Sequence, residues 1–274
     1  MEVSRQTSIR PLLFAPAVYG VRPHNSWRVS LEGLSPCLGI GPSAPRNPWD
    51  YVALMECAAV REFTGIHNMI RGLVRLMESA VSKAKPTDVK QMRVLADFGL
   101  FAVAGTHFHH SGEDDYYWPA VIRNGADASL LDPLVKEHLG IDPLLDETQR
   151  AFEALKHGGS DAQAIERLRV LVGRFKDDML AHLDHEEPIF FPLLNQYMPD
   201  DESERLGTQL AKKAPRKGIS WLIGGVEYGM TKEQSTEFMA TFPKPIQWMR
   251  PSLLRKYKKN CAVLGVDPAL PSQP

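Results

Sequence analysis

Two short stretches of the chain repeat the same pairing of a histidine with a glutamate. His109 precedes Glu113 by four residues, and His182 precedes Glu186 by four residues. In each stretch a proline follows the glutamate by six residues. Because residues four apart share one face of a helix, each stretch directs one imidazole and one carboxylate toward the same point. Two such helices facing each other would surround a cavity with nitrogen and oxygen donors, which is the ligand set of a dinuclear carboxylate site.

Two further histidines lie singly on apolar helical stripes. His67 lies within the apolar repeat of residues 63–77, and His138 lies within that of residues 131–145. Either one alone would be more simply explained as a core histidine with a satisfied ring. However, their intervals to the following pair are similar, 42 residues from 67 to 109 and 44 from 138 to 182. This repetition predicts one shared metal site built from His67, His109, Glu113, His138, His182 and Glu186.

The segments that must position these residues are predicted to be four long helices joined by short turns. Apolar residues recur every three or four positions in each segment. Proline, glycine and capping residues separate the segments. The helices are expected from about Pro48 to Pro86, from there to Asn124, from Ser129 to Lys156, and from Asp161 to Pro188 or beyond. The sequence therefore predicts an all-α fold, an up-down four-helix bundle with inward donors on each helix.

Composition divides the chain into three parts, with the bundle over residues 50–200. Residues 1–49 are rich in proline, glycine and serine, which predicts a loosely ordered extension. Residues 51–200 carry 15 Lys and Arg against 23 Asp and Glu, an acidic balance that suits a cation site. Residues 201–274 carry 12 against 7 and predict a basic helical extension. Its helices are expected over 201–213, 231–241 and 251–264, with a glycine-broken segment at 217–229.

The donor types and the cysteines restrict the kind of site. Cys37, Cys57 and Cys261 are far apart, which argues against a disulfide framework or a cysteine-based zinc site and suits a reducing cytosol. Imidazole and carboxylate donors without thiolate suit iron or manganese better than a structural zinc ion. No apolar run of about 18 residues occurs, so no membrane span is predicted. We therefore expect a cytoplasmic protein.

Other histidines near the two pairs are interpreted as lying outside the donor set. His110 follows His109 directly and should point about 100° away from it on a helix. His107 is treated in the same way, and His185 is expected at the rim. Each ligating imidazole needs a partner for its other ring nitrogen. The candidate partners are Asp114, Asp142, Asp184 and Glu187.

The order of a lone histidine, a pair, a second lone histidine and a second pair resembles the hemerythrin-like, or HHE cation-binding, family. The aromatic endings Tyr117-Trp118-Pro119 and Phe190-Phe191-Pro192 are also similar to that family. The resemblance covers about residues 50–200. It implies a four-helix bundle holding two non-haem iron ions bridged by carboxylates. The ligands that it implies are His67, His109, Glu113, His138, His182 and Glu186.

Two positions depart from the oxygen-carrying hemerythrins. Those proteins have a second histidine one turn after the third-helix histidine, where this sequence has Asp142. Their fourth helix ends in an aspartate five residues after its histidine, whereas Glu186 stands four residues after His182. The predicted donor set is therefore poorer in nitrogen, which disfavours simple reversible oxygen carriage.

We therefore expect a di-iron protein that binds, senses or turns over a small oxidant such as oxygen, hydrogen peroxide or nitric oxide. Catalase-like decomposition of peroxide is the enzymatic form of this hypothesis. The alternative is an iron- or redox-sensing module without turnover, whose basic C-terminal tail contacts a protein partner. A structural bundle without metal is a third interpretation. The basic tail is not enough to predict nucleic-acid binding.

Overall fold

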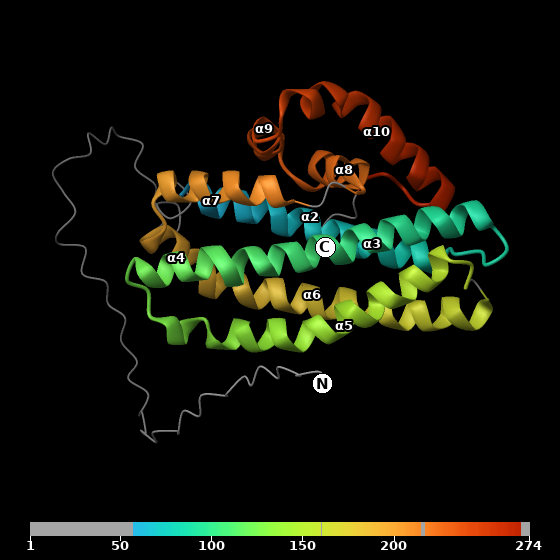
Figure 1. Ribbon diagram of the computed structural model, residues 1–274, viewed down its shortest axis with the longest axis horizontal. Helices are drawn as coiled ribbons and strands as arrows, with labels where there is room; N and C mark the ends of the chain where they lie inside the picture. Colours follow the sequence, from blue (N-terminus) through green and yellow to red (C-terminus); the bar gives the residue numbers. More distant parts are fainter. Residues whose placement is uncertain (1–56, 160, 215–216, 270–274) are drawn as a thin grey trace, which may run out of the picture. The chain divides into compact units, whose positions relative to one another are not determined.

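The computed structural model describes residues 57–159, 161–214 and 217–269 (Figure 1). All regular secondary structure in these residues is helical, which confirms the predicted all-α class. The four longest bundle segments are α2 (Ala58–Ser82), α3 (Val89–Gly112), α5 (Asp132–Lys156) and α6 (Ala162–Tyr197). Helix α2 packs against α3 and α6, and α5 also packs against α3 and α6, so the four helices surround a common interior. The predicted extension over residues 1–49 and the predicted helix start near Pro48 lie outside the described residues.

A π-helical turn, η1 (Glu113–Tyr117), directly follows α3. Such turns occur mostly as single insertions in α-helices, frequently at functional sites. The chain continues into α4 (Trp118–Arg123), and a 3₁₀ turn, η2 (Ala128–Leu130), leads to α5. The break predicted at Asn124-Gly125 is the end of α4, where Gly125 adopts a φ of 113° that favours glycine.

Helix α6 begins after Asp161, whose side chain accepts the backbone N–H of Ala164 as a capping bond. The helix then continues through Pro188 and Pro192 to Tyr197. A proline removes one backbone hydrogen bond from a helix interior, so continuity here requires compensation from packing. Beyond these prolines the helix buries Phe190, Leu193 and Leu194.

Four C-terminal helices complete the described chain: α7 (Asp200–Lys213), α8 (Ile219–Gly229), α9 (Lys232–Ala240) and α10 (Lys244–Leu264). Helix α8 packs against α2 and α10, and α10 packs against α3. The segment expected to be broken by glycines is thus helical. A Cβ added at Gly224 would lie 2.3 Å from the ring of Tyr257, so this glycine permits close helix packing. Helix α10 starts earlier than expected, at Lys244, with Pro245 in its first turn, where proline is tolerated, and it continues through Pro251.

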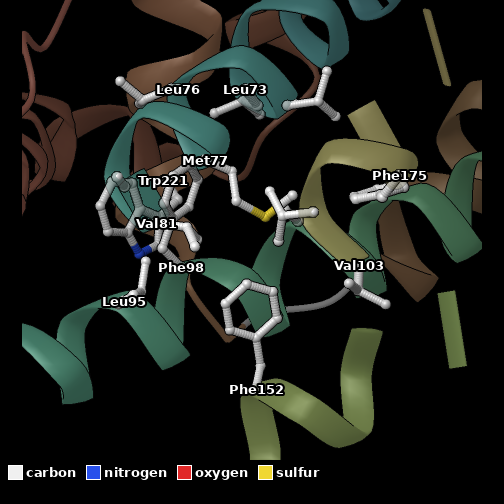
Figure 2. Packing of buried hydrophobic residues seen from close by; sticks show 14 of the residues in the cluster. Leu73, Leu76, Met77, Val81, Leu95, Phe98, Val103, Phe152, Phe175 and Trp221 are labelled. Atoms are coloured by element: carbon white, nitrogen blue, oxygen red, sulfur yellow. The ribbon is translucent and has the colours of Figure 1, made fainter. Parts of the chain in front are cut away.

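Two apolar clusters divide the interior of the bundle. On α2, Phe63 belongs to one cluster and Met69 to the other, and His67 lies between them along the helix. Figure 2 shows part of the larger cluster, where Phe98 of α3 stacks on Trp221 of α8 with ring centroids 4.1 Å apart. No described helix combines the length and the apolar character that crossing a membrane requires.

Candidate metal centre

The structure brings all six predicted donor residues into one buried layer of the bundle. They come from α2 (His67), α3 (His109), η1 (Glu113), α5 (His138) and α6 (His182 and Glu186). Each of the six side chains is at most 7% exposed. Such burial is costly for polar groups unless they find partners.

The first group of donors consists of His67, His109, Glu113 and Glu186. One donor atom from each of these residues lies within 4.8 Å of the others, a spacing that could hold a metal ion. The Nε2 atom of His109 is 3.2 Å from Oε1 of Glu113, and the Nε2 atom of His67 is 3.7 Å from Oε2 of Glu186. The imidazoles of His67 and His109 meet edge to face, with ring centroids 5.1 Å apart.

The second group contains a histidine that the sequence interpretation had left out. His110, His138 and His182 also offer three donor atoms within 4.8 Å of one another. The ring of His110 is buried and stacks on that of His138, with centroids 4.0 Å apart. The expectation that His110 points away from the site is therefore wrong.

The position of α3 between two neighbours explains why adjacent histidines both face inward. Helix α3 packs against α2 on one side and α5 on the other. The inward face of such a helix spans about 100° or more, enough to accommodate two successive positions. His109 thus meets His67 of α2, while His110 meets His138 of α5. The interior contains five imidazoles, so it is richer in nitrogen than the sequence predicted.

The two glutamates of the first group also face histidines of the second group. Glu113 directs Oε1 toward His109 and Oε2 toward His138, whose Nε2 atom is 3.6 Å away. Oε2 of Glu186 is 3.7 Å from Nε2 of His67 and 3.4 Å from Nε2 of His182. Each carboxylate therefore faces a histidine of both groups, which is the position that a bridging ligand requires.

Three of the imidazoles are oriented by carboxylates at the edge of the layer. The Nδ1 atom of His67 lies 3.0 Å from Glu187, that of His138 lies 3.0 Å from Asp114, and that of His182 lies 2.9 Å from Glu137. An imidazole that donates its Nδ1–H to a carboxylate presents the lone pair of Nε2 on the opposite side. If His138 and His182 are both in this tautomer, neither Nε2 atom carries a hydrogen. These two Nε2 atoms lie 3.2 Å apart and therefore form no hydrogen bond with each other.

The partners of the imidazoles are only partly those that the sequence suggested. Asp114 and Glu187 contact donor histidines directly, whereas Asp142 lies 3.8 Å from His107, outside both groups. Asp184 accepts a 2.7 Å hydrogen bond from Arg71 of α2. The sequence interpretation did not include Glu137, which stands one residue before His138 but turns toward α6.

Arg71 connects this outer set to the donors. Its guanidinium is buried and donates to Glu187 at 2.5 Å and to Asp184 at 2.7 Å. Glu187 therefore receives hydrogen bonds from Arg71 and His67 at the same oxygen. A charge-assisted contact of this kind fixes the carboxylate and, through it, the ring of His67.

The electrostatics of the layer follow from burial and from the two carboxylates. Burial lowers the pKa of His109 and of His110 well below the usual range, so both rings are neutral. Burial, together with the charge of Glu186, raises the pKa of Glu113 well above its usual value. Burial alone would also raise the pKa of Glu186, but the neighbouring imidazoles His67 and His182 outweigh it and lower that pKa.

Several donor atoms in this layer are buried without a hydrogen-bond partner in the described part of the chain. They are Nε2 of His67 and His109, both ring nitrogens of His110, and all four carboxylate oxygens of Glu113 and Glu186. Buried polar atoms are nearly always paired in folded proteins. The unpaired atoms point inward and include both nitrogen and oxygen, so they fit metal ions. The described cysteines, Cys57 and Cys261, belong to neither donor group.

The other nearby histidines and aromatic residues have different positions. His107 faces Asp142 and Asp146 outside the layer, and half-exposed His185 lies 2.5 Å from Glu137 at the rim. The ring of Trp118 stacks on His138 from the side opposite His110, with centroids 4.7 Å apart. Tyr116 accepts a hydrogen bond from Lys213 and does not belong to either donor group.

Comparison with known proteins gives one match. The sequence profile described as the hemerythrin HHE cation binding domain matches residues 58–203, more than half of the 274 residues. This segment runs from the start of α2 into α7 and contains every residue of both donor groups. Searches of curated proteins and of solved structures found no match. The extent of the profile match and the buried histidine–glutamate layer agree, and the chain therefore belongs to the hemerythrin family of HHE cation-binding domains.

Proposed function

We propose that this chain is a cytoplasmic non-haem di-iron protein that binds, senses or turns over a small oxidant. The observation that carries the proposal is the arrangement of two donor groups joined by two carboxylates, with most of their donor atoms lacking a hydrogen-bond partner among the described residues. A single ion would leave one of the two groups unsatisfied. Two ions account for both groups.

The ligand roles follow from the two groups. His67 and His109 would hold one ion, and His110, His138 and His182 would hold the other. Glu113 and Glu186, which face histidines on both sides, would be ligands shared by the two ions. All donors are nitrogen or oxygen, which favours iron over a structural zinc ion and leaves manganese as the alternative.

Two iron ions in this layer would supply the redox chemistry that a small oxidant such as oxygen, hydrogen peroxide or nitric oxide requires. The protein residues prepare the site by orienting the imidazoles of His138, His182 and His67 through Asp114, Glu137 and Glu187. The rings of Phe63, Trp118 and Phe190 are buried beside the layer and limit the access of water. Glu113 would hold a metal ion in its ionised form, so metal binding would be coupled to the loss of its proton.

Metal analysis of the protein as purified tests the proposal. We expect two iron ions per chain and a large loss of iron in His109→Ala. His157→Ala, at the exposed C-terminal end of α5, is the matched control and should keep the wild-type content. A purified protein that binds neither iron nor manganese after reconstitution would overturn the proposal.

Turnover and sensing are separated by a second measurement. Iron-loaded protein mixed with hydrogen peroxide should evolve oxygen if the protein decomposes peroxide. Sensing without turnover is the second candidate because α2, which carries His67, also packs against α8 and α9. In that case iron loading should change the protease sensitivity of residues 201–274 and leave peroxide intact.

A further inference from the structure

An apolar cavity of about 190 Å³ lies between α2 and α3 on one side and the C-terminal helices on the other. Its wall includes Ile66 and Ile70 from α2, Phe101 from α3, Leu210 from α7, Leu222 from α8 and Phe238 from α9. The C-terminal helices therefore do more than cover the bundle, because they form one wall of a partly open cavity. The metal layer of the bundle does not require such a space.

The cavity reaches the donor layer at one residue. His109 lines the cavity and also belongs to the donor group with His67, Glu113 and Glu186. Phe63 lines the cavity as well, and its ring centroid is 6.1 Å from that of His109. An occupant of the cavity would thus contact an imidazole whose Nε2 atom faces the interior of the metal site.

The size and polarity of the wall restrict the occupant. An apolar cavity of roughly 150 Å³ in another protein stays dry and binds benzene, so a cavity somewhat larger than that holds a fused bicyclic ring. The hydroxyls of Thr106 and Thr241 line the cavity and already donate hydrogen bonds to backbone carbonyl oxygens. They therefore do not need a ligand as an acceptor. Glu62 also lines the cavity, and burial raises its pKa, which favours the uncharged carboxyl beside an uncharged ligand.

We propose that this cavity binds a small, neutral, mainly apolar organic molecule of about the size of indole, directly beside His109. Aromatic walls from Phe63, Phe101 and Phe238 favour a flat ring. The inference adds an organic ligand to the oxidant of the proposed function. Binding in the cavity does not depend on that function, because protein side chains alone form the cavity. Only a reaction of the ligand with iron would rest on the proposed function.

Gly105 offers a way to fill the cavity without disturbing the fold. It lines the cavity one turn before His109 on α3, and a Cβ added there meets no atom within 4 Å. Glycine is unfavourable in a helix interior, so Gly105→Leu fills the space and also favours the helix. Gly140→Leu is the matched control, because Gly140 is exposed on α5, has equal free space, and lies away from the cavity.

Isothermal titration of the full-length, metal-loaded protein with indole tests the proposal. Wild type and Gly140→Leu should bind indole with the same affinity, and Gly105→Leu should bind it at least tenfold more weakly. The anion indole-3-carboxylate should bind wild type at least tenfold more weakly than indole. Wild type that takes up no indole at millimolar concentration, or equal binding by Gly105→Leu, would overturn the proposal.

The iron content of each sample separates this inference from the proposed function. Absent indole binding in a protein that contains two irons would refute the cavity proposal alone. Indole binding by a protein that cannot hold iron or manganese would refute the proposed function and leave the cavity proposal standing. A lower iron content in Gly105→Leu than in Gly140→Leu would mean that the variant disturbs His109. Gly105→Val, which has a shorter side chain, then replaces it, and equal indole binding by that variant overturns the proposal.

Discussion

The ring of His110 lies parallel to the ring of His138, with centroids 4.0 Å apart and planes inclined by 13°. The opposite face of His138 is covered by Trp118, whose ring is 4.7 Å away and inclined by 19°. His138 is therefore held between two aromatic planes, and its Nδ1 atom is held by Asp114. This arrangement makes His110 both a donor and a support for a second donor.

Replacing His110 with alanine should remove one of the two metal ions. The variant takes one of three imidazoles from its donor group and leaves a void beside His138. We expect the iron content measured by plasma emission spectroscopy to fall from about two to about one per chain. His107→Ala is the control, because His107 faces Asp142 and Asp146 outside the layer. Equal iron loss in both variants would contradict the role of His110.

Replacing Glu137 with glutamine should weaken metal binding without removing a ligand. Glu137 contacts Nδ1 of His182 at 2.9 Å and Nδ1 of His185 at 2.5 Å, and an amide would hold them less firmly. Loss of such an outer partner typically lowers metal affinity by roughly 10–100-fold. Competition with a chromophoric chelator measures the affinity. Exposed Glu147→Gln on the same helix is the control, and a wild-type affinity in Glu137→Gln would refute the assignment.

Removal of the metal ions should destabilise the bundle. The buried nitrogen and oxygen atoms of the layer lose their partners, and metal binding to the folded state is lost as a source of stability. At free metal a hundredfold above the dissociation constant, each bound ion stabilises the folded state by about 2.7 kcal/mol. Loss of one such contribution lowers the melting temperature, measured by circular dichroism, by about 5–10 °C, and chelation of both ions lowers it further. Superimposable melting curves with and without chelator would exclude a metal-stabilised bundle.

Replacing Gly224 with alanine should weaken the packing of α8 on α10. The added Cβ would lie 2.3 Å from the ring of buried Tyr257. This distance is a steric clash, so the ring or one of the two helices would have to shift. Overpacking of this kind costs about 1–3 kcal/mol. Gly173→Ala in α6 is the control, because its Cβ would meet open space, and it should be stabilising by about 0.5–1 kcal/mol. Urea unfolding followed by tryptophan fluorescence measures both, and similar shifts in the two variants would argue against tight packing at Gly224.

Replacing Glu62 with glutamine should flatten the dependence of stability on pH. Burial raises the pKa of Glu62 above 4.5, so the folded state binds this proton more tightly than the unfolded chain does. Its contribution is therefore full below the unfolded pKa and is lost as the pH rises toward the folded pKa. Urea unfolding of the metal-free protein across that window should show a smaller loss of stability in Glu62→Gln than in wild type. The exposed Glu147→Gln should keep the wild-type slope, and parallel slopes in all three proteins would count against a protonated Glu62.

Much of the fold and of the site could be predicted from local pattern. The spacing of four between His109 and Glu113 and between His182 and Glu186 follows directly from helical periodicity, as do the apolar stripes that contain His67 and His138. The boundaries at Asp161 and Asn124 reflect capping and turn chemistry within a few residues. These features depend on residues that are close in sequence, so they can be predicted without knowledge of how the helices pack.

Other features arise between helices, and local pattern does not contain them. His110 faces inward because α3 packs between α2 and α5, and Glu137 reaches His182 because α5 packs on α6. The cavity beside His109 exists because α7, α8 and α9 cover α2 and α3. The helix at residues 219–229 tolerates Gly224 and Gly225 because Tyr257 and Met69 fill the space that their side chains would occupy. In each case the partner lies far away in sequence. Periodicity along one helix predicts which face is apolar, but it does not predict which helix packs against that face.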